Sequence, residues 1–273
     1  MLADTGGLSD ALAHLPAQPV AALRVLELVE HPNASAAELA RLIEMDPSLS
    51  ARVIRLANAP YYGLARRVSS ASRAVVLLGF STVRALAVSA ACSLIIENGR
   101  QGPAGYWAHS IATASAASLV ARHAGSAPSD AFSAGLLHDV GTALLYRYDP
   151  EAHAAMLTRV RAGTDLAKAE RETFGRTHQE AGAEVLDVWR FPDDFVHAVA
   201  DHHSPPTSIR TTLGKLVAAG EAISASLAGS FDEPVGSLDD ALWSAGVNAP
   251  AARMITLARR ELTNVAAFLQ GDA

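Results

Sequence analysis

The stretch GLLHDVGTAL, residues 135–144, places an adjacent His138–Asp139 pair inside an otherwise apolar segment. Burying two polar side chains without partners costs roughly several kcal/mol, so each of them needs a hydrogen bond or a metal ion. The segment therefore predicts one of two arrangements. Either the pair belongs to a metal site, or the carboxylate holds the imidazole and caps nearby backbone groups without any metal.

The composition is that of a folded protein with a substantial core. Of the 273 residues, 50% are hydrophobic and 18% are charged, which is typical of a globular chain and not of a disordered one. A chain of this length can form one large domain or two modest ones. The formal net charge of −6 gives no electrostatic attraction to nucleic acid or to an anionic membrane, so we expect neither as a partner.

Three features predict a cytoplasmic protein. The single cysteine, Cys92, cannot form an internal disulfide, which suits a reducing compartment. Residues 1–19 lack the positively charged start and long apolar run of a signal peptide. The longest apolar run, residues 85–96, is too short to span a membrane.

Apolar residues recur with a helical period nearly everywhere. Leu49, Val53 and Leu56 fall at i, i+4 and i+7, and no segment shows the alternation that is typical of a strand. The sequence SAAE at 35–38 is a capping-box pattern, and Asp-Pro at 46–47 fits an N-cap followed by proline at the first helical position. The sequence therefore predicts an all-α protein.

Two interruptions divide the helical pattern into three parts. Gly, Pro and polar residues break it at 97–105 and again at 228–237. We therefore expect an N-terminal helical lobe at 1–100, a second helical lobe at 101–228 and a C-terminal helical extension at 229–273. The first break also fits a boundary between two lobes of one domain, because helices on both sides of it have apolar faces.

The second lobe and the C-terminal extension each contain a distinctive predicted helix. The helix at 106–125 carries a face of small side chains, Ala112, Ser115 and Ala116, which would let a neighbouring helix approach closely. The amphipathic helix at 254–269 has few basic residues, so we expect it to pack or to self-associate and not to bind a membrane.

Residues without a motif around them are expected to be structural. We place five histidines at the surface or at a boundary: His14, His31, His123, His153 and His197. The tryptophans are expected to be core or interface anchors: Trp107, Trp189 and Trp243. Tyr61 and Tyr62 are expected to pack a turn between helices.

The remaining histidines follow one another in an order that suggests a metal site. The candidate ligands are His109, His138, Asp139, His178, His202, His203 and Glu221. Imidazole and carboxylate groups suit zinc, iron or manganese. Consecutive residues on a helix point roughly 100° apart, so we expect Asp139 to bridge toward a second ion and not to chelate beside His138. Two ions that share a carboxylate would activate water for attack on phosphate.

This order of histidines resembles the HD phosphohydrolase superfamily and especially its HD-GYP branch. Three further segments resemble the HDOD (HD-related output domain) family: the Asp-Pro at 46–47, RLANAPYYG at 55–63 and LLGFSTVR at 77–84. The similarity extends from about Leu15 to about Ile223.

The resemblance implies an all-α, two-lobed helical bundle in which the N-terminal lobe packs on an HD-like lobe. It also implies a bacterial signal-transduction output or scaffold module that acts by protein–protein contact and is generally non-catalytic. By the same resemblance, the seven candidate ligands match the superfamily's metal-site positions, with Glu221 where the superfamily has aspartate. The implied cofactor is one or two divalent ions (Fe, Mn or Zn).

Two departures weaken the case for an enzyme. HD-GYP enzymes follow the His-Asp pair with a glycine and a lysine, whereas Thr142 follows Gly141 in this chain. No GYP motif follows His203; the sequence reads SPPTS at 204–208. We therefore expect no catalytic residue, although His138 and Asp139 would be the catalytic pair of an active enzyme.

Three functions remain open on the sequence alone. The first is the signalling scaffold, whose partners would be other signalling proteins. The second is a metal-dependent phosphohydrolase acting on a nucleotide or a cyclic dinucleotide. The third is a sensor in which a bound nucleotide or metal shifts the two lobes without turnover. A homo-oligomer is compatible with each of them.

Overall fold

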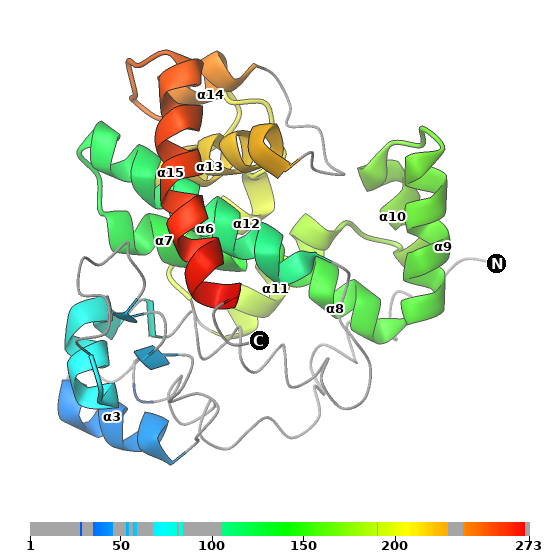
Figure 1. Cartoon of the computed structure of the whole chain (residues 1–273). Coiled ribbons are helices and arrows are strands. Elements are labelled where there is room, and N and C mark those ends of the chain that lie inside the picture. Colours follow the sequence, from blue (N-terminus) through cyan, green and yellow to red (C-terminus); the bar gives the residue numbers. More distant parts are fainter. Residues whose placement is uncertain are drawn as a thin grey trace.

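The computed structural model describes residues 35–45, 68–80, 105–189, 191–228 and 237–270, together with single positions at 28, 53–54, 57–58 and 82–83. Within these ranges every regular element is helical, and no strand is present (Figure 1). The all-α prediction is confirmed. The predictions for Asp46-Pro47, Tyr61-Tyr62, Cys92 and most of the break at 97–105 lie outside the described residues.

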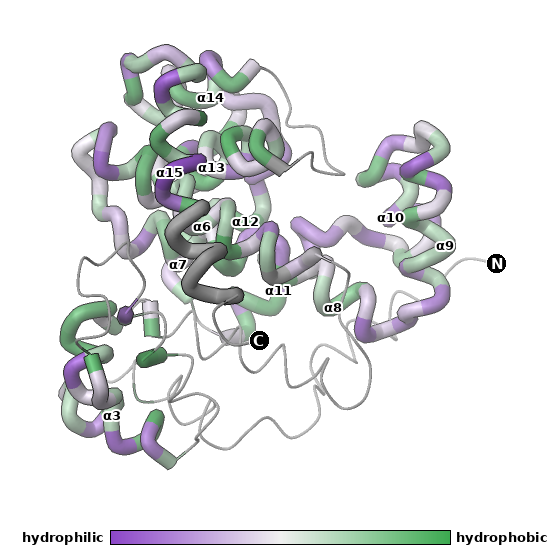
Figure 2. The backbone as a smooth tube through the Cα atoms, in the orientation of Figure 1, coloured by the Kyte–Doolittle hydropathy of each residue, from purple (hydrophilic) through white to green (hydrophobic). Residues whose placement is uncertain are grey.

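Figure 1 shows how the named helices are arranged. They are α3 (Ala36–Glu44), α6 (Tyr106–Ala124), α7 (Pro128–Leu137), α8 (Val140–Tyr148), α9 (Pro150–Arg161), α10 (Leu166–Phe174), α11 (His178–Val188), α12 (Asp193–Asp201), α13 (Thr212–Ala228), α14 (Leu238–Ser244) and α15 (Ala251–Gln270). Hydrophobic and hydrophilic residues alternate within most of them, as expected of helices that bury one face (Figure 2).

The N-terminal part begins with the predicted capping box. The Ser35 hydroxyl accepts the backbone N–H of Glu38 at 3.2 Å, and the Glu38 carboxylate accepts the backbone N–H of Ser35 at 3.0 Å. The helix α3 then buries Leu39 and Ile43 in a small core that also includes residues of the helical segment 71–80. The Ser133 hydroxyl donates to Thr82 at 3.4 Å, so this part touches α7 of the second lobe.

Helix α6 is the axis of the second lobe, because α7 and α13 both pack closely against it. A Cβ atom at Gly220 of α13 would lie 2.5 Å from the backbone nitrogen of Ala117. A Cβ at Gly135 of α7 would lie 2.8 Å from the Cα of Ala114. The predicted close approach is confirmed, although Ala114 and Ala117 make these contacts and Ala112 is only half-buried.

Helices α8 and α11 approach each other still more closely. A Cβ at Gly141 would lie 1.8 Å from the carbonyl oxygen of His178, so no side chain can be accommodated there. Gly182, one turn further along α11, faces Gly141 from the other side, with 3.2 Å between its ideal Cβ position and the Gly141 nitrogen. The first turns of α8 and α11 are therefore in backbone contact, which brings Asp139 and His178 together.

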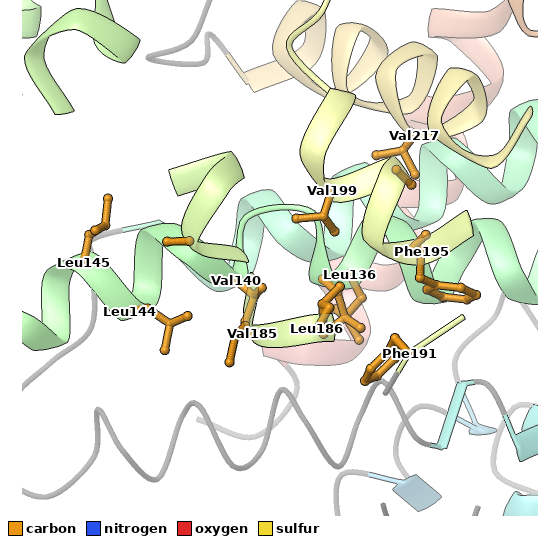
Figure 3. Close-up of a cluster of buried hydrophobic side chains, with 14 of the residues drawn as sticks. Leu136, Val140, Leu144, Leu145, Val185, Leu186, Phe191, Phe195, Val199 and Val217 are labelled. Atoms are coloured by element: carbon orange, nitrogen blue, oxygen red, sulfur yellow. The ribbon is translucent and has the colours of Figure 1, made fainter. Parts of the chain in front are cut away.

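The main hydrophobic core surrounds this contact. Leu136, Leu145, Val185 and Leu186 are almost fully buried, and Val199 of α12 packs against them (Figure 3). Because α7, α8, α11 and α12 all contribute to this core, it fixes the ends of the helices that carry the candidate ligands.

The predicted C-terminal helices are present as α14 and α15. Helix α15, red in Figure 1, lies against α6 and α13, buries Met254 and pairs Glu261 with Arg122 of α6 at 2.6 Å. Trp243 of α14 is 79% exposed, so of the two predicted roles, core anchor or interface anchor, it does not have the first. Among the described helices, none is both long and apolar enough to cross a membrane.

Replacing Gly141 with alanine should destabilise the protein strongly. The new methyl group meets the His178 carbonyl and not a movable side chain, so we expect the free energy of unfolding to fall by about 3 kcal/mol or more. Urea denaturation measures this change. The control Ala155→Ser also adds one heavy atom but on an exposed face of α9, and should change stability by less than about 0.5 kcal/mol. Equal effects of the two substitutions would contradict the proposed backbone contact.

Candidate metal centre

His138 and Asp139 lie in the break between two helices. His138 is the C-cap of α7, and Asp139 precedes the first residue of α8 with φ −99° and ψ 16°. The expectation that both residues belong to one helix and point apart was therefore wrong. His138 Nε2 and Asp139 Oδ2 are 3.5 Å apart, so the two side chains face the same point.

The other predicted ligands come from four different helices. His109 lies on α6, His178 is the first residue of α11, His202 and His203 directly follow α12, and Glu221 lies on α13. The structure brings all seven predicted residues together in three overlapping groups whose donor atoms lie within 4.8 Å of one another. The members of the groups are Asp139, His178, His202 and His203; His109, His138 and Asp139; and His138, His202 and Glu221.

The first group surrounds one oxygen of Asp139. Asp139 Oδ1 lies 3.5 Å from His178 Nε2 and 3.6 Å from His202 Nε2. The two imidazole nitrogens are 3.2 Å from each other. Asp139, His178 and His202 are all buried, and His203 is mostly buried, so this group lies inside the protein.

The outer nitrogen atoms determine which tautomer each buried histidine adopts. His138 Nδ1 is 2.7 Å from the Gly135 carbonyl, and His202 Nδ1 is 2.7 Å from the Val199 carbonyl. A carbonyl oxygen can only accept, so both Nδ1 atoms carry hydrogen, and the neutral ring then has a bare Nε2. His178 Nδ1 is held in the same way by the carboxylate of Glu170 at 2.8 Å.

These tautomers leave the centre of the first group without a proton donor. The Nε2 atoms of His178 and His202 face each other with lone pairs at 3.2 Å. Asp139 Oδ1 and His203 Nε2 are buried and have no hydrogen-bond partner among the described residues. With neutral rings, the Nε2 lone pairs of His178 and His202 and the carboxylate oxygen of Asp139 converge with no donor between them, and a divalent metal ion fits this donor set.

The second and third groups extend the centre toward α6 and α13. His109 Nε2 lies 3.0 Å from His138 Nε2 and 3.4 Å from Asp139 Oδ2. His203 Nε2 lies 3.5 Å from Glu221 Oε1 on the opposite side. Asp139 thus offers Oδ1 to the first group and Oδ2 to the second. This is the arrangement by which one carboxylate can serve two ions.

Burial keeps two of these histidines, His138 and His203, neutral. Complete burial is the main reason why the pKa of His138 is lowered from 6.5 to about 3. Burial and the neighbouring imidazole of His202 hold the pKa of His203 well below 6.5. Burial by itself would raise the pKa of Asp139, but the surrounding imidazoles, His138 first, hold it well below its usual value. His138, His203 and Asp139 are therefore in the protonation states that metal binding requires.

The arrangement does not fit the metal-free alternative in which Asp139 caps backbone groups. No side-chain capping bond is formed by Asp139 at the start of α8. Its charged contacts among the described residues are the imidazoles His109, His138, His178 and His202. A carboxylate that faces several imidazoles and caps no helix is typical of a ligand.

Two residues near the centre were not predicted from the sequence. Glu170 is 2% exposed and holds His178 from outside, whereas its segment KAERE at 168–172 reads as a solvated run of charges. Asp201 precedes the His202–His203 pair and accepts two hydrogen bonds from the Arg210 guanidinium, each 2.8 Å long. This ion pair ties the two ends of the loop that follows α12.

The structure also tests the expectations for residues outside the candidate centre. His153 was expected at the surface but is 3% exposed and packs edge-on against Tyr146, with ring centroids 5.5 Å apart. Burial lowers its pKa. Trp189 packs against the main core as expected, and His123 is exposed and His197 half-buried, also as expected.

The chain departs from the HD-GYP pattern at Thr142 and in the loop that follows His203. Thr142 is in the first turn of α8, half-buried, and its N–H donates to the Asp139 carbonyl at 2.9 Å. A neutral side chain therefore stands where those enzymes have lysine. The loop after His203 contains Pro205 and Pro206 and is partly exposed.

The helical fold and the buried histidine–carboxylate centre define an HD-like all-helical protein. This chain belongs to the HDOD domain family, whose model matches residues 15–205. The resemblance inferred from the sequence motifs is confirmed.

Three comparisons place the chain among known proteins. It is 23% identical over 203 residues to an uncharacterized protein of Treponema pallidum (strain Nichols); the match covers 73% of this chain and 39% of that protein. An HDOD domain protein of unknown function from Geobacter sulfurreducens has a TM-score of 0.72 at 25% identity, covering 97% of both chains. A protein from Shewanella amazonensis SB2B, named as a candidate phosphohydrolase, has a TM-score of 0.74 at 24% identity, covering 97% of this chain and 99% of that one. The two solved structures share the fold of this chain.

The metal-free protein should lose stability as the solution is acidified below pH 6.5. His138 and His203 bind a proton in the unfolded chain below that pH but resist it when folded, so the unfolded state gains protons first. Each such histidine contributes a slope of about 1.4 kcal/mol per pH unit. Urea unfolding of chelator-treated protein between pH 7.5 and 5.5 measures this slope.

A pair of variants tests the origin of the slope. His138→Gln should reduce it, because the replaced side chain can no longer take up a proton on unfolding. His123→Gln makes the same change on an exposed residue of α6 and should leave the slope as it is. A metal-free protein whose stability is constant or rises on acidification would contradict the neutral, buried state of these histidines.

Proposed function

We propose that this chain is a metal-binding signalling output module of the HDOD family, which acts through protein–protein contact and is not a hydrolase. The metal-binding part of this proposal rests on the first group of donor atoms. Ligand atoms of Asp139, His178, His202 and His203 converge in the interior within 4.8 Å of one another, and Asp139 Oδ1 and His203 Nε2 have no hydrogen-bond partner among the described residues. The signalling role rests on the family, and the cytoplasm is the proposed location.

The donor set favours zinc, iron or manganese. It combines imidazole nitrogens with carboxylate oxygens, and no cysteine takes part among the described residues. One ion would occupy the group of Asp139, His178, His202 and His203. A second ion would be held by His109, His138 and the other Asp139 oxygen, with Glu221 at the far side of the centre. The module therefore has ligands for one ion or two.

The proposal of a non-hydrolytic module rests on charge. A phosphoryl group gains charge during hydrolysis and needs positive groups around it. Thr142 is neutral, and the partners of Asp139 among the described residues include His138, whose pKa burial lowers to about 3. With no lysine beside the pair, the ions alone would have to neutralise a bound phosphate.

The alternative function is a metal-dependent phosphohydrolase acting on a nucleotide or a cyclic dinucleotide. The observation that favours it is that Asp139 belongs to two ligand groups at once. A pair of bound divalent ions would supply an activated water and stabilise the phosphoryl oxygens. In that case Asp139 would hold both ions, and His138 and His109 would position the second.

Metal analysis of protein purified without added metal tests the central proposal. We expect close to one or two equivalents of zinc, iron or manganese per chain. His202→Ala removes a ligand whose lone pair points into the first group, so its metal content should fall to less than about one tenth. The control His123→Ala should keep the metal content of the unsubstituted protein. Metal-free protein that does not take up these ions when they are added would overturn the proposal.

A turnover assay distinguishes the module from the hydrolase. The metal-loaded protein should hydrolyse bis-p-nitrophenyl phosphate and cyclic dinucleotides no faster than its Asp139→Asn variant, because the cation beside the pair is missing. In parallel, crosslinking in cells should recover specific signalling proteins. Turnover that disappears in Asp139→Asn, together with no specific partner, would instead establish the hydrolase.

A further inference from the structure

We infer that Glu170 is a positioning residue that makes His178 a metal ligand; this inference rests on the metal binding proposed above. Glu170 lies on α10, outside the three ligand groups, and is 2% exposed. Its two carboxylate oxygens lie 2.8 and 2.9 Å from His178 Nδ1. One of these oxygens also accepts the backbone N–H of His178 at 3.0 Å. Within the described residues, the hydrogen bonds of this carboxylate all go to His178.

The contact fixes the proton of His178 on the outer nitrogen. A carboxylate accepts a hydrogen bond, so Nδ1 carries the hydrogen, and the neutral ring then presents the lone pair of Nε2 to the centre. There Nε2 lies 3.2 Å from His202 Nε2 and 3.5 Å from Asp139 Oδ1. Such a carboxylate–histidine pair also raises the basicity of the imidazole toward a metal.

His178 differs in this respect from the other two buried ligands. His138 and His202 donate Nδ1–H to neutral backbone carbonyls. His178 alone among these three donates to a charged side chain, and therefore should be the strongest donor of electron density. A side chain can also be replaced by mutation, whereas the carbonyl acceptors cannot.

Glu170 accepts one backbone N–H at the start of α11, that of His178, but the start of this helix has other contacts as well. Thr177 already caps the helix, since its hydroxyl accepts the Glu180 N–H at 3.2 Å and the Glu180 carboxylate accepts the Thr177 N–H at 2.9 Å. The ion pair between Arg171 and Glu180, at 2.7 Å, joins α10 to α11 independently of Glu170. The start of α11 therefore does not depend on Glu170 alone, and the contact of this carboxylate with the imidazole is a second role.

The test measures Zn²⁺ affinity by chelator competition in Glu170→Gln. The neutral amide loses the charge and one of the two acceptor oxygens, so we expect the affinity to fall 10- to 100-fold. The matched control Glu172→Gln makes the same change on the same helix, at an exposed residue paired with Arg159. Its affinity should stay within about threefold of the unsubstituted protein.

A double-mutant cycle shows whether Glu170 acts through His178. In a His178→Gln background, adding Glu170→Gln should weaken Zn²⁺ binding by less than about threefold, because the residue it positions is gone. An unchanged affinity in Glu170→Gln, or a full additional loss in the His178→Gln background, would overturn the inference.

A measurement on the metal-free protein separates this inference from the proposed function. Long-range ¹H–¹⁵N spectra of the unsubstituted protein should show His178 neutral with its proton on Nδ1, and need neither bound metal nor a folded variant. A protein that binds no Zn²⁺ but shows this tautomer would refute the proposed metal centre while leaving the contact with Glu170 intact. A proton on Nε2 instead would overturn the inference itself.

Discussion

Three buried histidines, His138, His178 and His202, share one centre. Each carries hydrogen on Nδ1, the ring nitrogen that points away from that centre. His138 and His202 donate outward to backbone carbonyls, and His178 donates outward to Glu170. In the neutral rings the inner nitrogens are acceptors: those of His178 and His202 lie near Asp139 Oδ1, and that of His138 lies near Asp139 Oδ2. Such an arrangement of lone pairs is unfavourable in a dry interior unless a cation joins them. The metal binding proposed for this centre therefore rests on hydrogen bonds that lie outside it.

The fold supplies the positions from which these hydrogen bonds are made. Gly141 lets α8 touch the backbone of His178, so the ends of two helices meet where the ligands lie. The break between α7 and α8 directs His138 and Asp139 to one point. Glu170 connects the centre to α10, and Asp201 with Arg210 closes the loop that follows the His202–His203 pair. A substitution that breaks any of these contacts is therefore expected to displace a side chain of the centre.

Much of this architecture could be predicted from the sequence. Helical periodicity gave the fold class, the capping box at Ser35 was found at the predicted place, and the order of histidines led to all seven residues of the centre. The family resemblance was confirmed over residues 15–205. These features are local in the chain or are spaced in a recognisable order, so tertiary structure was not needed to see them.

The remainder depends on tertiary contacts that the sequence does not display. The helix break at His138 has no proline or glycine at the break itself, so the pair was placed on one helix. Glu170 lies in a charged segment and looks like a surface residue until α10 is folded against α11. His153 was misplaced because a single side chain carries no periodic signal: it was expected at the surface or at a boundary and is buried.

The most direct test of the central claim follows the inner nitrogens when metal is added. Long-range ¹H–¹⁵N spectra of the metal-free protein at pH 7 should show Nε2 of His138, His178 and His202 without hydrogen. On addition of Zn²⁺, the Nε2 resonances of at least His178 and His202 should shift, while the Nδ1 protons stay in place. Protonated Nε2 atoms in the metal-free protein, with no response to Zn²⁺, would contradict the account.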